Sequence, residues 1–298
     1  MRKLREGIIA ALWTPTDAAG RVAESELKAN LDFVKGHGVH GFMVLGSTGE
    51  FLYLSLEARK QLLRTVCTYA GDLPIIANIS EVNLAVVADL GRYARDLGVD
   101  SVSVLPPWYY PMAQEDLVEF FVRAGEASRL PLCLYNFPER TGNRIALETI
   151  AAVADRVPVA SIKQSGGEFA YHRELVALGR EKNFVVFTGG EIRLAEAMAL
   201  GVTGCVSGLL NAVPELVRDI FDAVKMGDQG RAERATARLQ RVGALVEGLE
   251  FPLNVAASMA ARGLATGRPK APLSAATRAR YDRLVADLRN LYRELGLN

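Results

Sequence analysis

The stretch Ser161-Ile162-Lys163-Gln164-Ser165-Gly166-Gly167 follows the short apolar run Val157-Pro158-Val159-Ala160. In a strand, side chains alternate between two faces, which places Val159, Ser161 and Lys163 together on one face. A lysine at the end of an apolar strand is costly to bury as an ammonium ion. One solution is a neutral amine, which is a nucleophile able to form a Schiff base with a carbonyl substrate. The alternative is a side chain that reaches solvent or pairs with a carboxylate.

Seven further apolar runs share this pattern, and each is followed by an amphipathic stretch. Eight strand–helix units in about 220 residues predict an α/β fold, the (β/α)8 TIM barrel, which typically takes ~250 residues. The main alternative is a doubly wound open sheet, but no G-x-G-x-x-G motif follows any of the predicted strands. The predicted strands are 7–12, 41–45, 74–78, 101–105, 131–136, 157–163, 184–188 and 204–207. Between them the helices are expected at 24–35, 55–70, 83–97 and 114–128, from 147, after 167, up to 200 and after 214.

The chain beyond residue 228 predicts three more helices, at 229–250, 253–262 and 274–295. No linker rich in Pro, Gly or Ser precedes them. We therefore expect a barrel catalytic domain at residues 1–228 and, at 229–298, a C-terminal helical extension packed on the barrel.

Composition excludes several classes of function. The 298 residues are 50% hydrophobic and 23% charged, and 35 basic against 34 acidic residues leave a net charge of +1. No basic stripe interleaved with aromatic residues appears, so no nucleic-acid partner is expected. No apolar run reaches the ~18 residues of a membrane helix, and residues 1–7 lack the apolar region of a secretion signal. Three widely spaced cysteines, Cys67, Cys133 and Cys205, are typical of reduced core residues in a cytoplasmic protein.

Active sites of barrels lie at the carboxyl ends of the strands, and these ends are rich in hydroxyl groups and glycine here. The second strand ends in Gly46-Ser47-Thr48-Gly49-Glu50. Its N–H groups and hydroxyls suit a carboxylate or phosphate, although a plain turn before the next helix gives the same pattern. It is not a P-loop, because no Gly-Lys-Ser/Thr follows.

Three other strand-end features carry candidate chemistry, each with a structural alternative. Tyr135 lies one strand from Lys163 and can shuttle a proton, or can be a core tyrosine bonded to the backbone. Trp108-Tyr109-Tyr110 is an aromatic cluster that fits either the site or a subunit interface. Arg140 can hold a substrate carboxylate or form a surface ion pair.

No metal is expected in the site. The only histidines are His37, His40 and His172, and no Cys-x-x-Cys occurs. His37 and His40 precede the second strand, which is the end of the barrel opposite to catalysis.

Gly46-Ser47-Thr48-Gly49-Glu50, Tyr135-Asn136-x-Pro138 and Ile162-Lys163, in this order and spacing, resemble the dihydrodipicolinate synthase / N-acetylneuraminate lyase family. The resemblance covers essentially the whole chain. It implies a class I, pyruvate-dependent aldolase or lyase that needs no cofactor or metal beyond its own Schiff base. It also implies a homotetramer built as a dimer of dimers, with pyruvate and an aldehyde as the small-molecule partners.

The resemblance also implies roles for individual residues. Lys163 forms the Schiff base with the 2-oxo acid, Tyr135 relays protons, and Ser47 extends that relay. Thr48 and the backbone beside Gly46 hold the pyruvate carboxylate.

Three further residues complete the implied site. The Val206 carbonyl faces the bound pyruvate. Arg140 matches the arginine that synthases use for the carboxylate of the second substrate, and Tyr109 matches the tyrosine that reaches a neighbouring subunit's site.

Three segments depart from the synthase pattern. Synthases continue the lysine motif as Lys-Glu-Ala-Thr/Ser-Gly, whereas this chain has Lys163-Gln164-Ser165-Gly166-Gly167. The strand-4 loop 107–111 is closer to that of the lyases, and the third strand leads into residues 77–81 without the usual glycine-rich turn. Val86 stands where lysine-inhibited synthases carry a glutamate, so inhibition by lysine is not expected.

The leading hypothesis is a dihydrodipicolinate synthase-like condensation of pyruvate with aspartate semialdehyde. The alternatives are an aldolase or dehydratase of 2-oxo-3-deoxy sugar acids, an N-acetylneuraminate lyase-like enzyme, and a catalytically silent barrel that binds a 2-oxo acid.

Overall fold

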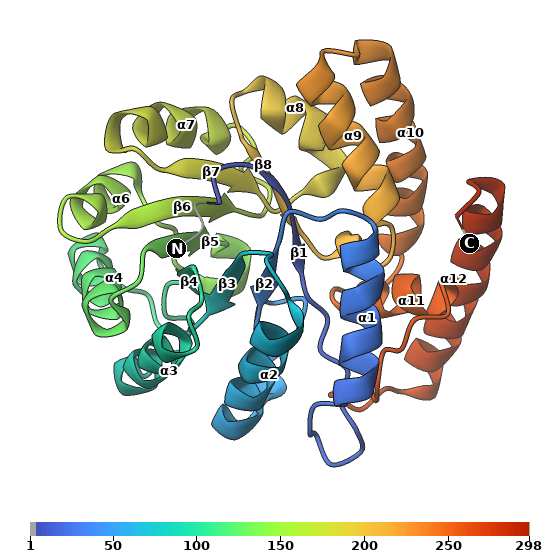
Figure 1. Cartoon of the computed structure of the whole chain (residues 1–298), viewed down its shortest axis with the longest axis horizontal. Helices are drawn as coiled ribbons and strands as arrows, with labels where there is room; N and C mark the ends of the chain where they lie inside the picture. Colours follow the sequence, from blue (N-terminus) through green and yellow to red (C-terminus); the bar gives the residue numbers. More distant parts are fainter. Residues whose placement is uncertain (1–3, 298) are drawn as a thin grey trace.

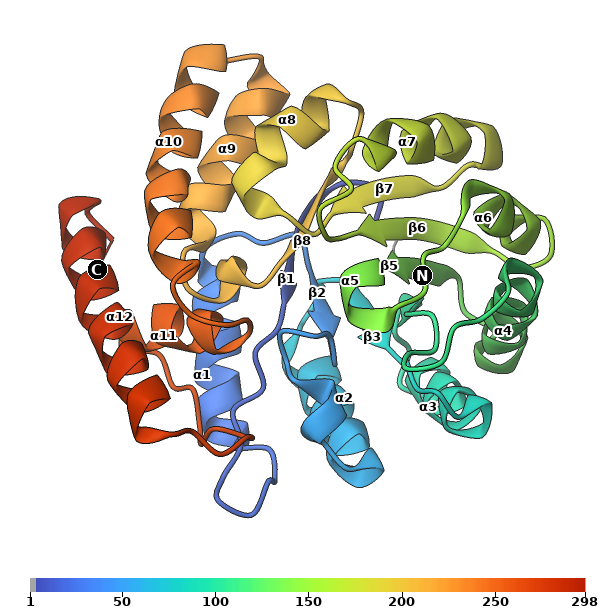
Figure 2. The same ribbon diagram turned by 180° about the vertical axis from the view of Figure 1, so that it is seen from behind.

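Eight parallel strands close into a barrel in simple chain order, with helices around the outside (Figures 1 and 2). These are the coordinates of a computed structural model, which describes residues 4–297; residues 1–3, part of the stretch considered for a secretion signal, lie outside the described residues. The predicted (β/α)8 barrel is confirmed. The strands are β1 Gly7–Ala11, β2 Gly41–Val44, β3 Ile75–Asn78, β4 Ser101–Val104, β5 Leu132–Asn136, β6 Val159–Gln164, β7 Val185–Thr188 and β8 Gly204–Ser207.

The alternation predicted for the lysine strand is confirmed for Ser161, Ile162 and Lys163. It is wrong for Val159, which packs against the outer cluster because the pairing of β5 with β6 shifts register between Leu132 and Cys133. Ile162 lies in the large cluster shared with the surrounding helices. Cys133 and Phe187, the neighbours that pair with Ser161 and Lys163, lie in a separate cluster inside the barrel. Both faces of the strands in a parallel barrel are covered, so these strands can be almost wholly apolar. A polar side chain on the inner face, such as that of Lys163, is therefore a candidate for a functional role.

The helices agree with the predicted segments to within a few residues at most ends. Those around the barrel are α1 Glu24–Gly36, α2 Leu56–Tyr69, α3 Leu84–Asp96, α4 Gln114–Ser128, α5 Pro138–Thr141, α6 Leu147–Ala154, α7 Tyr171–Lys182, α8 Leu194–Ala199 and α9 Pro214–Met226. Ser55 caps α2, because its side chain accepts a hydrogen bond from the Ala58 N–H.

The C-terminal segment adds α10 Gln229–Val246, α11 Leu253–Ala261 and α12 Ala275–Glu294, with α12 outermost (Figure 1). Helix α10 packs along α9, and α11 packs between α12 and the turn after β8. The domain boundary at residue 228 stays a prediction. Helix α10 ends four residues before the expected Glu250, where Gly248 and Pro252 interrupt the helical pattern.

One further helix bears on the placement of the site. The short helix α5, for which no helix was predicted, starts with Pro138 and ends at Gly142 in a left-handed conformation. It lies at the mouth of the barrel, beside β5 (Figure 2). Among residues 4–297, no helix combines the length and apolarity needed to cross a bilayer.

Candidate active site

Lys163 projects from β6 toward the barrel interior and is 5% exposed. Its Nζ lies 4.1 Å from the centroid of the Tyr135 ring, on the neighbouring strand at the paired position. Within residues 4–297, no ion pair includes Lys163. The amine therefore lies inside the barrel against an aromatic ring, in a position from which it can attack a carbonyl carbon.

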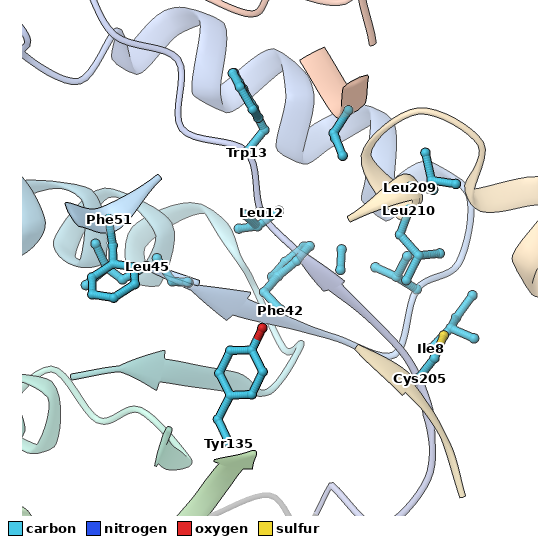
Figure 3. Close-up of a cluster of buried hydrophobic side chains, with 14 of the residues drawn as sticks. Ile8, Leu12, Trp13, Phe42, Leu45, Phe51, Tyr135, Cys205, Leu209 and Leu210 are labelled. Carbon is cyan, nitrogen blue, oxygen red and sulfur yellow. The ribbon is translucent and has the colours of Figure 1, made fainter. Parts of the chain in front are cut away.

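Tyr135 is 2% exposed and crosses from β5 toward β2, as Figure 3 shows. Its hydroxyl lies 3.4 Å from the Ser47 hydroxyl, and either oxygen can donate. A phenol beside the amine and a second alcohol beyond it form a short path along which a proton can move.

The turn Gly46–Glu50 carries Ser47 and Thr48 at the end of β2. Leu45 enters it in a left-handed conformation with φ +64°, and the Asn78 side chain donates to the Leu45 carbonyl at 2.7 Å. None of the hydrogen bonds among the described residues uses the N–H of Ser47 or Thr48 as donor. Two available N–H groups beside two hydroxyls form an arrangement suited to a carboxylate.

A cavity of about 300 Å3 opens beside the lysine, and most of the predicted site residues line it. Thr48, Tyr135, Arg140, Lys163 and Val206 all contribute to its wall, whereas Ser47 lines an adjoining cavity of about 350 Å3 that also touches Arg140.

Arg140 is exposed, and its guanidinium lies 5.9 Å and 5.8 Å from the ring centroids of Phe137 and Phe251. None of the ion pairs in the described part of the chain includes it. Its fork is therefore open to an anionic ligand.

The loop after Lys163 is held from both sides. The Ser165 N–H donates to the Asn136 carbonyl at 2.9 Å, and the Gly189 N–H donates to the Gln164 carbonyl at 2.7 Å. The Gly167 N–H donates to the Glu139 carboxylate at 2.6 Å, which ties the loop to α5. These bonds fix the backbone on which the lysine stands.

Glu191 is a residue of the cavity that the sequence reading missed. Burial raises the pKa of its carboxyl group, although its own N–H, the Ser207 hydroxyl and the charge of Lys163 act in the opposite direction. Its carboxyl group and the Lys163 amine line the same cavity. Its position directly after the glycines that end β7 is a signal that could have found it.

Two predicted residues lie apart from the cavity. Tyr109 is 84% exposed with φ +82°, and its ring packs edge-on against Tyr110 at 4.8 Å. Gly46 shapes the turn without lining the cavity. In the part of the chain that the structure describes, no cluster of three His, Cys, Asp or Glu side chains could hold a metal ion.

Comparison with known proteins places this barrel in a family. The profile of the dihydrodipicolinate synthetase family matches residues 4–291. The chain is 28% identical to a 4-hydroxy-tetrahydrodipicolinate synthase of Methanothrix thermoacetophila, over 90% of each protein. It is 29% identical to an uncharacterized DapA-like lyase of Halobacterium salinarum, covering 96% of this chain and 93% of that protein.

Solved structures give the same result. YagE, a prophage protein of the dihydrodipicolinic acid synthase family from Escherichia coli K12, solved in complex with pyruvate, superposes with a TM-score of 0.90 at 25% identity, covering 97% of this chain and 99% of that one. Dihydrodipicolinate synthase from Aquifex aeolicus superposes with a TM-score of 0.89 at 25% identity and 98% coverage of both chains.

Proposed function

This chain belongs to the dihydrodipicolinate synthetase family and is a lyase, and from that premise we propose that it condenses pyruvate with aspartate semialdehyde through a Schiff base on Lys163. The observation that carries the proposal is the buried Lys163 amine, without an ion-pair partner among residues 4–297, against the ring of Tyr135. The 4-hydroxy-tetrahydrodipicolinate synthases among its relatives support this choice of second substrate.

In the proposed mechanism, the Lys163 nitrogen attacks C2 of pyruvate, and the resulting carbinolamine loses water to give an iminium ion. The iminium draws electrons from the methyl carbon, which loses a proton and becomes an enamine. The enamine carbon then attacks the aldehyde carbon. Tyr135, linked to Ser47, supplies and removes the protons at oxygen in these steps.

The proposed binding of pyruvate uses both walls of the cavity. The N–H groups of Ser47 and Thr48 and the Thr48 hydroxyl hold the carboxylate, and the backbone at Gly46 gives the turn its shape. The Val206 carbonyl, on β8, also borders the cavity and faces the bound molecule. Arg140 holds the carboxylate of the second substrate by a bidentate contact.

We further propose that the active assembly is a homotetramer built from dimers, in which Tyr109 completes a neighbour's site. Its exposed ring and its distance from the cavity of its own chain are consistent with that role. Free cysteines at positions 67, 133 and 205 support a reducing compartment, the cytoplasm.

A steady-state assay tests the substrate. The protein is supplied with pyruvate and aspartate semialdehyde, and, in parallel, with a panel of 2-oxo-3-deoxy sugar acids and N-acetylneuraminate. We expect turnover of the semialdehyde and at most weak cleavage of the sugar acids. Turnover of a sugar acid alone would move the proposal to that substrate, and no turnover of any of them would contradict it.

A further inference from the structure

Lys270 lies between α11 and α12, more than 100 residues beyond Lys163, yet it reaches the turn that carries Ser47 and Thr48. Its Nζ donates to the Glu50 carboxylate and to the Thr14 carbonyl, at 2.7 Å each. The side chain is 4% exposed and its Nζ lies 4.7 Å from the centroid of the Trp13 ring. One buried cation thus joins the ends of β1 and β2.

Glu50 is the last residue of the turn and is held in a left-handed conformation with φ +55°. Its N–H donates to the Ser47 carbonyl at 3.1 Å, and the Gly49 N–H donates to the Gly46 carbonyl at 3.0 Å. Movement of Glu50 is therefore transmitted to Ser47 through one hydrogen bond.

The close packing of the turn gives a second link between Lys270 and the site. A Cβ atom added at Gly49 would lie 2.9 Å from both the Leu12 carbonyl and the Thr14 hydroxyl. The turn therefore rests directly on the segment whose Thr14 carbonyl Lys270 binds; Figure 3 shows Leu12 and Trp13 where the chain leaves β1.

Anchoring of the C-terminal segment does not explain the pair. Three other hydrogen bonds already dock this segment: Trp13 Nε1 to the Thr266 carbonyl at 2.9 Å, Asn30 Nδ2 to the Ala265 carbonyl at 2.8 Å, and the Arg268 N–H to the Thr16 carbonyl at 2.8 Å. A buried ion pair is also weak evidence for stability, since desolvation offsets most of the attraction. Lys270 differs from these contacts in that it binds the Glu50 carboxylate, which belongs to the turn.

We propose that Lys270 and Glu50 are positioning residues that hold the N–H groups of Ser47 and Thr48 in the geometry that receives the carboxylate of the 2-oxo acid. This inference rests on the proposed function. It makes the C-terminal extension a working part of the site, because the extension supplies the cation that fixes the turn.

The test compares Lys270→Met, Glu50→Gln and the double variant with Arg268→Met as the matched control. Arg268 lies in the same segment, is exposed, and its side chain forms no hydrogen bond or ion pair with the other described residues. The readouts are the apparent affinity for pyruvate, from borohydride trapping at increasing pyruvate concentration, and the thermal midpoint. Small displacements of positioned groups cost up to ~10²-fold, so we expect affinity to fall roughly 10- to 100-fold in each single variant.

Three results together support the inference. The double variant loses no more pyruvate affinity than the single variant that binds pyruvate more weakly. Trapping at saturating pyruvate is retained, and Arg268→Met has the pyruvate affinity and thermal midpoint of the wild type. Unchanged pyruvate affinity in folded Lys270→Met, or an equal loss in Arg268→Met, would overturn it. If Lys270→Met does not fold, Glu50→Gln, which keeps the side-chain shape, decides in the same way. Absence of trapping in the wild type would instead contradict the proposed function.

Discussion

Lys163 and Tyr135 face each other because they occupy paired positions on adjacent parallel strands whose inward faces coincide. This juxtaposition was predictable from sequence, since strand order and period-2 alternation determine it. The hydroxyl of Tyr135 was placed beside Ser47 only by the resemblance to a known family. Glu191 was not predicted, although it directly follows the glycines after β7, because a residue at that place lines the cavity only if the loop folds over the end of β8.

Replacing Tyr135 with Phe removes the hydroxyl and keeps the ring that packs on Lys163 and Phe137. We expect kcat to fall by roughly 10²- to 10⁴-fold, the usual contribution of general acid–base catalysis, with little change in thermal midpoint. Tyr281→Phe, which loses a hydrogen bond of the same 3.4 Å length to the Ala256 carbonyl, is the matched control. Full activity in Tyr135→Phe would exclude the proton relay.

Replacing Glu191 with Gln tests the buried carboxyl group through stability. Because the folded-state pKa is raised, the contribution of this group to stability is complete below its unfolded pKa and is lost as pH rises through the folded value. The thermal midpoint of Glu191→Gln should match the wild type near pH 4 and exceed it increasingly at higher pH. Glu126→Gln, at an exposed position on α4, should show no such divergence. Parallel curves for Glu191→Gln and wild type would mean that the carboxyl group is not desolvated.

At the scale of elements, most helix boundaries coincide with local features of the sequence, such as Ser55 before α2 and Gly296 after α12. The residues that line the cavity from the C-terminal segment could not be predicted in this way. Val246, Phe251 and Val255 reach it from the segment at the end of α10 and the start of α11, and no local pattern reveals which barrel loop such residues will face.

The loop after β7 gives a sharp test of how tightly the site is packed. A Cβ atom at Gly189 would lie 1.9 Å from the Ser165 hydroxyl and 3.3 Å from Lys163 Cε, whereas one at Gly190 would meet nothing closer than Thr188 Oγ1 at 3.7 Å. We expect Gly189→Ala to lower stability by about 1–3 kcal/mol and to slow Schiff-base formation, and Gly190→Ala to do neither. Denaturant unfolding and the rate of borohydride trapping measure the two effects. Equal behaviour of the two variants would contradict the packing described for Lys163.

At the scale of the whole molecule, several large side chains at the mouth of the barrel are exposed. Leu52 and Tyr53 line the same cavity as Trp108, the neighbour of Tyr109, and are 57% and 61% exposed. Exposed apolar groups gathered in one region mark an interaction surface. The assembly was predicted from the resemblance, because a single sequence does not show which exposed side chains meet a second copy.

We expect light scattering to give at least a dimer, and Tyr109→Arg to shift the mass toward the monomer with loss of activity. Met226→Arg places the same charge at another exposed apolar residue, 73% exposed at the end of α9, and should change neither property. An unchanged mass and activity for Tyr109→Arg would remove Tyr109 from the proposed interface and from the neighbour's site.

The central claim concerns one nitrogen atom, and the most direct measurement is borohydride reduction in the presence of pyruvate, followed by intact mass and peptide mapping. The account predicts one reduced pyruvate adduct per chain, located on Lys163, and none in Lys163→Met. No adduct on the wild type, or an adduct on a different lysine that persists in Lys163→Met, would contradict it.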